Sequence, residues 1–287
     1  MTRRPELSID WAKAWKQRDA ERERPAEKEI WNKRARTYVS KSKCKSGYIQ
    51  KFLDYLDLGG QAKTILDIGS GPGVLSIPLA LMGHTVYALD IAPNMLQVLR
   101  DTIDSYDEPQ KSMLQQRIKT IEGAWESDWD ELGIPKVDIC IASRSTMVHD
   151  LDDAINKLNT YAKERVAITV VAQASPKNDP ALFKAIGRDS NFGFDYIYYV
   201  NLLNQKGIPA DMRMITSVKQ EKYQTKAEAY EQARAMLGDM SAEEQGRLKE
   251  FLDLHLIKHE ESQTYWAKDY DHVVRWAFIS WNPNEHL

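Results

Sequence analysis

The sequence contains few cysteines and no long apolar run. Its 287 residues include only two cysteines, Cys44 and Cys140. Two cysteines can neither build a disulfide framework nor ligate a structural zinc ion, so we expect no disulfides and no metal site. The absence of a run of about 18 apolar residues excludes a membrane-spanning helix. Met1–Arg4 leads into charged residues, so we expect no secretory signal and a cytoplasmic protein that does not contact a membrane.

The formal net charge of −3 conceals an uneven distribution of charge. Residues 1–45 hold fourteen Lys or Arg against seven Asp or Glu, a local charge of +7, so the remaining residues carry −10. A basic segment on an acidic body fits two interpretations, an arm that binds a polyanion or a charged helix whose charges are solvated.

From Lys63 onward, short apolar strands alternate with helical segments. The strands are expected at Thr64–Ile68, Thr85–Leu89, Lys119–Glu122, Val137–Ala142 and Val166–Val171. The helices between them are expected at Val74–Met82, Pro93–Ser105 and Leu151–Ala162. This alternation predicts an α/β fold, a doubly wound and mostly parallel sheet with helices on both faces. In such a sheet, ligands bind beyond the carboxyl ends of the strands.

The segment that says most about function is the glycine-rich run from Leu66 to Val74, with the sequence Leu-Asp-Ile-Gly-Ser-Gly-Pro-Gly-Val. A strand enters three glycines at alternate positions, and a helix is expected directly afterwards. Glycine tolerates positive φ and lets a ligand approach the backbone, while a helix start offers unpaired N–H donors. The segment therefore predicts a binding loop for an anionic or carboxylate group.

Asp90 ends the next predicted strand and lies 21 residues after Gly69. An acid at this place can accept both hydroxyls of a ribose, which holds for nicotinamide cofactors as well as for other adenosine cofactors. The nicotinamide fingerprint requires a third glycine or alanine where this chain has Val74, because Gly73 comes one position early. The spacing therefore disfavours a nicotinamide-dependent oxidoreductase, which we keep as an alternative.

Asp67-x-Gly69-x-Gly71-x-Gly73 followed by Asp90 resembles the class I S-adenosylmethionine-dependent methyltransferases, with a small-molecule methyltransferase as the nearest type. Residues 91–95, Ile-Ala-Pro-Asn-Met, fit the family's continuation after the acid. The resemblance covers residues 31–172 and implies a seven-stranded Rossmann-like methyltransferase fold. It also implies S-adenosyl-L-methionine as the cofactor and S-adenosyl-L-homocysteine as the product.

The resemblance assigns cofactor contacts to individual residues. Gly69, Ser70 and Gly71 would pass under the methionine part, and Asp67 would help to bind its ammonium group. Asp90 would hold the ribose hydroxyls, and the adenine would lie against a group made of Ile91, Met95, Ala124 and Trp125. The family usually has an acid after the third strand, where this chain has Gly-Ala-Trp-Glu at residues 123–126. The Ala124 backbone and stacking on Trp125 would replace that acid, although Trp125 also fits an exposed surface position.

Further candidates follow the fourth predicted strand and precede the first. Ser143 would contact the cofactor, and Arg144 could orient an anionic acceptor through its guanidinium. His149 resembles the histidine of many small-molecule methyltransferases and is the first candidate for a general base, although a place at the pocket rim fits equally well. Residues 31–38 resemble a helix that folds over the cofactor, so Tyr38 would contact the cofactor and is the second candidate base. A packing role for Tyr38 is the alternative.

Four segments follow from this interpretation. We expect an N-terminal helical segment and cofactor lid over 1–58, the cofactor-binding α/β core over 59–225, a helical insertion and candidate substrate lid over 226–265, and a final strand completing the sheet over 266–287. Within the insertion, Ser241 and Glu244 form a capping-box pattern ahead of a long helix.

The methyl acceptor is expected to be a small molecule. No Asn/Asp-Pro-Pro-aromatic motif follows the fourth strand, which argues against methylation of base amines, and the acidic body disfavours a nucleic-acid groove. A non-catalytic module that binds the cofactor as a sensor, or a partner through its N-terminal helix, is a further alternative. The sequence leaves the oligomeric state open, with a homodimer as one option.

Overall fold

The structure is a computed structural model that describes residues 9–20, 27–42, 47–172, 178–189, 195–219, 221–258 and 264–286. Of residues 27 and 36–42 it describes the backbone alone. The chain forms two compact units. The first comprises residues 1–170, 195–215 and 277–287, and the second comprises residues 171–194 and 216–276. The second unit contains residues 226–265, where the sequence indicates a helical insertion.

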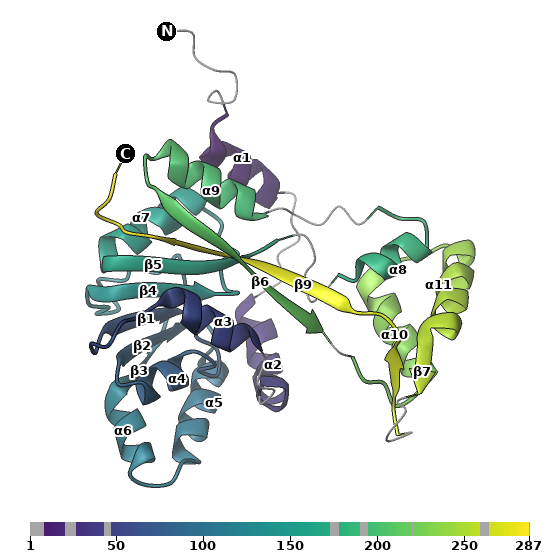
Figure 1. Cartoon of the computed structure of the whole chain (residues 1–287), viewed down its shortest axis with the longest axis horizontal. Coiled ribbons are helices and arrows are strands. Elements are labelled where there is room, and N and C mark those ends of the chain that lie inside the picture. Colours follow the sequence, from purple (N-terminus) through teal and green to yellow (C-terminus); the bar gives the residue numbers. More distant parts are fainter. Residues whose placement is uncertain are drawn as a thin grey trace. The chain divides into compact units, whose positions relative to one another are not determined.

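The chain forms a seven-stranded sheet in the order β3-β2-β1-β4-β5-β9-β6, most of whose residues belong to the first unit. Its strands are β1 Thr64–Ile68, β2 Thr85–Asp90, β3 Ile118–Glu122, β4 Val137–Ser143, β5 Ala162–Val171, β6 Ala210–Lys219 and β9 His272–Trp281. The pairs β1–β2, β1–β4, β2–β3 and β4–β5 are parallel, and the five strands that they join follow one another across the sheet in Figure 1. The predicted α/β fold with a doubly wound, mostly parallel sheet is confirmed.

The central strands are buried on both faces, as their apolar sequences require. Ile65, Leu66 and Ile68 of β1 are at most 1% exposed, and Cys140 of β4 is fully buried. Helices on both sides of a parallel sheet exclude water from both faces, which selects continuous apolar strands rather than alternating ones. Burial raises the pKa of the Cys140 thiol well above its ordinary value, so this side chain behaves as a small apolar residue.

The helices of the first unit connect or cover these strands. They are α3 Gly47–Leu56, α4 Ser76–Leu81, α5 Pro93–Asp104, α6 Gln110–Arg117, α7 Leu151–Tyr161 and α9 Asp195–Gln205. Helix α4 begins two residues later than the sequence suggests, so Pro78 stands in its first turn, where a missing N–H costs no helical hydrogen bond. No helix in the described part of the chain is both long and apolar enough to cross a bilayer.

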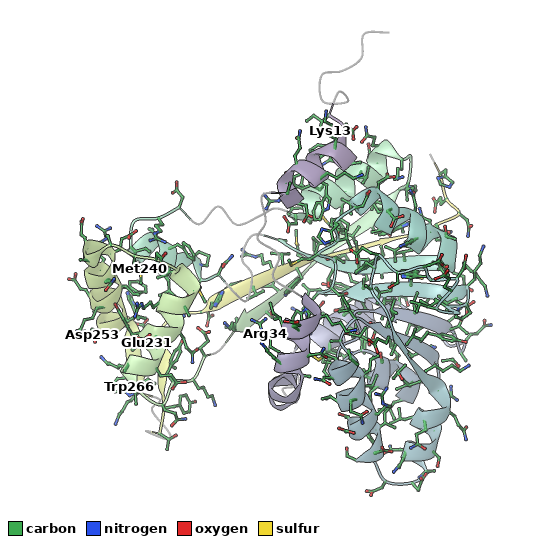
Figure 2. All side chains as sticks on the ribbon, turned by 180° about the vertical axis from the view of Figure 1, so that it is seen from behind. Lys13, Arg34, Glu231, Met240, Asp253 and Trp266 are labelled. Atoms are coloured by element: carbon green, nitrogen blue, oxygen red, sulfur yellow. The ribbon has the colours of Figure 1, made fainter. Side chains whose placement is uncertain are left out.

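Two N-terminal helices pack on the first unit. Helix α1, Trp11–Ala20, contacts α9 and α7, and helix α2, Glu27–Ser42, contacts α5. Trp15 anchors α1, because it is 1% exposed and its indole N–H donates to the Val148 carbonyl at 3.0 Å. The basic residues Lys13 and Arg34 lie on the exposed sides of these helices (Figure 2). Each helix therefore has one side that packs on the first unit and another that exposes basic residues.

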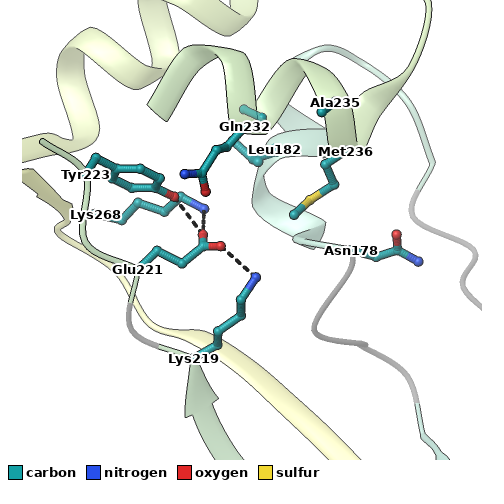
Figure 3. Close-up of a pocket in the computed structure, with 10 residues that line it drawn as sticks. Asn178, Leu182, Lys219, Glu221, Tyr223, Gln232, Ala235, Met236 and Lys268 are labelled. Carbon is teal, nitrogen blue, oxygen red and sulfur yellow. Dashed lines mark hydrogen bonds and ion pairs between the residues drawn. The ribbon is translucent and has the colours of Figure 1, made fainter. Parts of the chain in front are cut away.

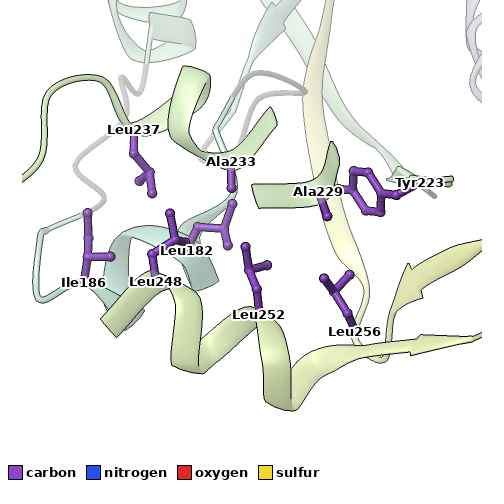
Figure 4. Packing of buried hydrophobic residues seen from close by; sticks show 9 residues of the cluster. All are labelled: Leu182, Ile186, Tyr223, Ala229, Ala233, Leu237, Leu248, Leu252 and Leu256. Carbon is purple, nitrogen blue, oxygen red and sulfur yellow. The ribbon is translucent and has the colours of Figure 1, made fainter. Parts of the chain in front are cut away.

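The second unit has its own apolar core. It contains α8 Pro180–Ala185, α10 Lys226–Leu237 and α11 Ala242–His255, followed by the antiparallel pair of β7 Leu256–Lys258 and β8 Trp266–Lys268. Leu182 of α8, Ala233 of α10 and Leu252 of α11 meet in the buried cluster shown in Figure 4. The predicted capping box is present at the start of α11, where Ser241 Oγ accepts from the Glu244 N–H and the Glu244 side chain accepts from the Ser241 N–H.

Replacing Trp15 by alanine tests the docking of α1. Because the indole is buried and hydrogen-bonded, Trp15→Ala is expected to lower the free energy of opening of this helix by about 3 kcal/mol. Hydrogen exchange of the amides in residues 11–20 measures that free energy. Lys13→Ala is the control at an exposed position of the same helix and should change it by less than about 0.5 kcal/mol. Equal exchange in both variants would show that Trp15 does not anchor the helix.

Candidate functional site

A loop of three glycines joins β1 to α4 and adopts a backbone that favours glycine. The φ angles of Gly69, Gly71 and Gly73 are 71°, 55° and 82°. The N–H groups of Gly69 and Ser70 both donate to the Leu89 carbonyl, at 2.8 and 3.0 Å. These bonds hold the loop against the carboxyl end of β2, which is the edge of the sheet where ligands bind in this fold.

The three glycines have different surroundings. A Cβ on Gly69 would lie 2.3 Å from Ser145 Cβ, and a Cβ on Gly73 would lie 2.2 Å from Leu99 Cδ1. A Cβ on Gly71, in contrast, would meet no atom of the described residues within 4 Å. Gly69 and Gly73 therefore allow close packing of the protein, while Gly71 borders open space.

Ser70 lies between Gly69 and Gly71 and is 7% exposed. Its Oγ is buried and has no hydrogen-bond partner among the described residues. Buried hydroxyls are nearly always hydrogen-bonded, so this one marks a place where a bound group or a water molecule would complete the site. The open space beside Gly71 lies next to it in the chain.

Asp90 lies at the end of β2, and its side chain accepts a hydrogen bond from the same loop. The Gly71 N–H donates to Asp90 Oδ2 at 2.7 Å, and the Ala92 N–H donates to Oδ1 at 2.8 Å. Burial raises the pKa of Asp90, while these two hydrogen bonds act in the opposite direction. Each carboxylate oxygen can accept more than one hydrogen bond, so Asp90 keeps acceptor capacity for ligand hydroxyls.

Asp67 is the more deeply buried of the two carboxyl groups, with 2% of its surface exposed. Its pKa is raised to about 7, because burial and the charge of Asp90 outweigh the hydrogen bond that the Ser76 hydroxyl donates to Oδ2 at 2.6 Å. A buried carboxyl group that is half protonated near neutral pH would become ionised beside a cation.

Ile91 and Met95 follow Asp90 and lie in an apolar group with α2. Met95 is 2% exposed and packs with Ala35 and Ala92, and the partly buried Ile91 and Trp31 pack against the same group. The structure thus brings α2 next to the two residues that the sequence assigns to the adenine side. The side chain of Tyr38, also in α2, lies outside the described side chains.

The segment after β3 contains Ala124 and Trp125. The Ala124 N–H donates to Ser127 Oγ at 3.0 Å, so this backbone donor already has a partner. Trp125 is partly buried, and its indole N–H donates to the Ser145 carbonyl at 2.8 Å. Trp125 therefore joins the loop after β4, and the exposed position that the sequence also allowed for it is not what the structure shows.

Ser143 and Arg144 lie at the carboxyl end of β4. The Ser143 hydroxyl and the Tyr48 hydroxyl are 2.7 Å apart, and Tyr48 is also 2.7 Å from Thr169 Oγ1. The Arg144 N–H donates to Thr169 Oγ1 at 3.0 Å, and the Arg144 guanidinium lies 4.5 Å from the centre of the Tyr48 ring. Arg144 has a positive φ of 58° and an exposed side chain.

His149 lies further along, where α1 packs on the first unit. Its Nδ1 is 3.1 Å from Asp19 Oδ2, and the side chains of His149 and Asp19 are 59% and 9% exposed. The carboxylate can hold the imidazole as the Nδ1–H tautomer, which leaves Nε2 as a proton acceptor. Asp150, the next residue, caps α7 by accepting from the N–H groups of Asp152 and Asp153. Both residues therefore have definite partners.

Four residues of this region were not singled out from the sequence: Asp19, Tyr48, Ser76 and Ser145. Ser145 packs against Gly69 and donates to the Ile68 carbonyl at 2.5 Å, which ties the loop after β4 to the end of β1. Ser76 lies nine residues after Asp67 at the start of a helix, so the turn between them could have indicated the contact. Asp19 and Tyr48 reach their partners across more than 90 residues and give no local signal.

Comparisons with known proteins give one family match and several relatives. A family model for a methyltransferase domain matches residues 65–164, which include Asp67, the glycine loop and Asp90. An uncharacterised protein of Haemophilus influenzae is 38% identical over 242 residues, or 83% of this chain and 82% of that protein.

Two solved structures represent the structural relatives. Precorrin-6y C5,15-methyltransferase from Geobacter metallireducens GS-15 has a TM-score of 0.47 at 14% identity, covering 81% of this chain and 86% of that one. Magnesium protoporphyrin IX methyltransferase from Synechocystis PCC 6803, with bound S-adenosylhomocysteine, has a TM-score of 0.45 at 13% identity, covering 92% and 93%.

Gly69→Ala and Gly71→Ala are a matched pair of variants. They compare a glycine that packs closely against Ser145 with a glycine that borders open space. Both variants place a Cβ on a residue with positive φ, which costs about 1–2 kcal/mol. Gly69→Ala also forces the backbone away from Ser145, so we expect its free energy of unfolding to fall by about 2–4 kcal/mol in total. Urea denaturation of the two variants measures the difference. Equal losses would contradict the close contact between Gly69 and Ser145.

Proposed function

The chain belongs to the class I S-adenosylmethionine-dependent methyltransferases, and we propose that it transfers the methyl group of this cofactor to a small-molecule acceptor. The observation that carries the proposal is the glycine loop bonded to Asp90, with open space beside Gly71 and, in the same loop, a Ser70 hydroxyl that has no partner among the described residues. A backbone that a ligand can approach and a ribose-binding acid stand together there.

The residues around the loop fit the parts of S-adenosylmethionine. Gly69, Ser70 and Gly71 would lie under the methionine part, with Asp67 as the partner of its ammonium group. Asp90 would accept the ribose hydroxyls. The adenine would lie among a group comprising Ile91, Met95, Ala124 and Trp125, and Ser143 would contact the cofactor from β4. Because the Ala124 N–H already donates to Ser127 Oγ and the Trp125 indole N–H donates to the Ser145 carbonyl, stacking on the Trp125 ring is the stronger candidate for recognition of the adenine.

The chemistry supplied by the bound cofactor is an electrophilic methyl group on a sulfonium. The protein must then align the acceptor with that methyl group and exclude water. A general base is needed only where the acceptor loses a proton. We assign that role first to His149, whose Nδ1 faces Asp19, and second to Tyr38. The exposed guanidinium of Arg144 would bind an anionic group of the acceptor.

A titration of the full chain with S-adenosylhomocysteine tests the proposed function. Calorimetry should show saturable binding to the wild type. Asp90→Asn removes one carboxylate acceptor and its charge, so its affinity should be at least about tenfold lower. Asp211→Asn is the control, because it makes the same change at an exposed position of β6, an edge strand of the sheet, and it should bind as the wild type does. Absence of binding to the wild type would overturn the proposal.

The pH dependence of the same titration tests the role of Asp67. Below pH 7 the free carboxyl group is mostly protonated, because burial raises its pKa to about 7. If it binds the ligand's ammonium group as a carboxylate, it must lose that proton on binding. The affinity for S-adenosylhomocysteine should therefore rise from pH 5 to pH 7, by up to about tenfold per unit, and then level off. Asp67→Asn should remove this rise, and an unchanged profile in that variant would exclude Asp67 as the titrating group.

A further inference from the structure

Strand β6 lies at one end of the seven-stranded sheet, and no described strand pairs with its outer edge. Its first residues, Ala210–Met214, are all exposed, whereas the next residue, Ile215, is fully buried. At the outer edge of such a strand, every second residue presents an N–H and a C=O group that no neighbouring strand binds. We call residues 210–214, which belong to the first unit, the β6 edge.

The β6 edge has apolar side chains on one face and charged side chains on the other, because alternate residues of a strand share a face. Met212 and Met214 lie on one face and are 45% and 39% exposed. Asp211 and Arg213 lie on the opposite face and have opposite charges. Charges of one sign along an edge would repel a second copy of it, whereas one acid and one base permit pairing.

The contacts of the β6 edge with the rest of the first unit are few. The Arg213 guanidinium lies 5.3 Å from the centre of the Tyr55 ring of α3. The Tyr55 hydroxyl donates to the Met214 carbonyl at 3.5 Å, and a carbonyl oxygen can accept a second hydrogen bond. Neither Asp211 nor Arg213 forms an ion pair with a described residue. Both charges can therefore meet a partner from outside the chain.

Charged residues at two other places have partners within the chain. At β3, the opposite end of the sheet, Glu122 pairs with Lys28 at 2.7 Å. At the cavity of the second unit, Glu221 lies 2.6 Å from Lys219 and 2.8 Å from Lys268 (Figure 3). The charges of the β6 edge have no such partner among the described residues.

The spacing of its two charges makes the β6 edge complementary to itself. In an antiparallel pair about a two-fold axis normal to the sheet, residues that lie directly opposite share a face. With the axis at Met212, Asp211 of each copy lies opposite Arg213 of the other, and Ala210 lies opposite Met214. Moving the axis to Asp211 or to Arg213 would place two like charges directly opposite, which is destabilising.

We propose that the β6 edge pairs with the same edge of a second copy of this chain, in antiparallel orientation about Met212. Main-chain hydrogen bonds and the contact between the two Met212 side chains would supply affinity. The two pairs of Asp211 with Arg213 would fix the register. Because the paired segment is short, the association should be reversible, with a dissociation constant on the order of micromolar.

The proposal goes beyond methyl transfer and does not depend on it. The glycine loop and Asp90 lie outside the β6 edge, so the affinity for S-adenosylhomocysteine should be the same in monomer and dimer. The tests below need no cofactor, and a failure of one proposal leaves the other intact.

Sedimentation velocity of the full-length protein, over about 1–200 μM, tests the proposal. The wild type should pass from monomer to dimer as its concentration rises. Arg213→Asp places Asp opposite Asp, and Asp211→Arg places Arg opposite Arg, so each variant alone should have a dissociation constant at least about tenfold higher. An equimolar mixture of the two variants should form heterodimers with about the affinity of the wild type, because every Asp then lies opposite an Arg.

Lys119→Asp is the matched control for charge reversal. Lys119 is exposed on β3, and its ammonium lies 5.2 Å from the centre of the Tyr87 ring, much as Arg213 lies at Tyr55. This variant should dimerise as the wild type does. Circular dichroism should show that all the variants are folded. If a single variant does not fold, the double variant with Arg at 211 and Asp at 213 restores the complementary pairs and should dimerise as the wild type does.

Three results would overturn the proposal. The first is a wild type that stays monomeric over the whole concentration range. The second is a dimer that both Arg213→Asp and Asp211→Arg leave unchanged, which would place the contact on another surface. The third is a mixture of the two folded variants that associates no better than either variant alone, which would exclude the register about Met212.

Discussion

The close contact between Gly69 and Ser145 is the constraint on which the candidate cofactor site depends. It requires a residue without a Cβ at the end of β1, and it is held by the hydrogen bond from Ser145 Oγ to the Ile68 carbonyl. β1 and β4 are neighbours in the sheet. The strand order reverses between them, because β2 and β3 follow on the side of β1 and β5 follows on the side of β4. Such a point is where open α/β sheets bind their ligands. Because the Ser145 carbonyl also accepts from Trp125, the contact joins three loops that come from different parts of the sequence.

The two buried carboxyl groups at this edge are stabilised in different ways. Asp90 accepts two backbone N–H groups, and one of these belongs to Gly71, so its charge also shapes the loop. Asp67 accepts a hydrogen bond from the Ser76 hydroxyl, and burial together with the charge of Asp90 raises its pKa to about 7. A second charge so close to the first is costly without a cation. A positively charged ligand group beside Asp67 would offset this cost, as the proposed contact with the ammonium group of the cofactor requires.

Features that depend on local sequence patterns could be predicted from the sequence alone. Strands β1 and β2, the glycine loop, Asp90 at the strand end and the capping box at Ser241 each follow from spacing within a few residues, and the structure contains all of them. Contacts between distant segments could not be predicted in this way. Tyr48 reaches Ser143 and Thr169 from a helix that precedes the whole sheet, and Asp19 meets His149 across 130 positions. Helix α6 at Gln110–Arg117 was also missed, because Leu114 is its only buried residue and it has almost no apolar periodicity.

The basic N-terminal segment can be understood from its partners in the first unit. Lys16 pairs with Asp150, Arg18 with Asp195 and Lys28 with Glu122, at 2.7, 2.9 and 2.7 Å, so basic residues of α1 and α2 face acidic residues of the body. Surface ion pairs of this kind contribute little to stability, so the burial of Trp15 and of the Ala35–Met95 contact must supply most of the docking free energy. The ion pairs instead favour one orientation of each helix on the body. These three basic residues are thereby partly neutralised, which reduces the positive charge that they could offer to a polyanion.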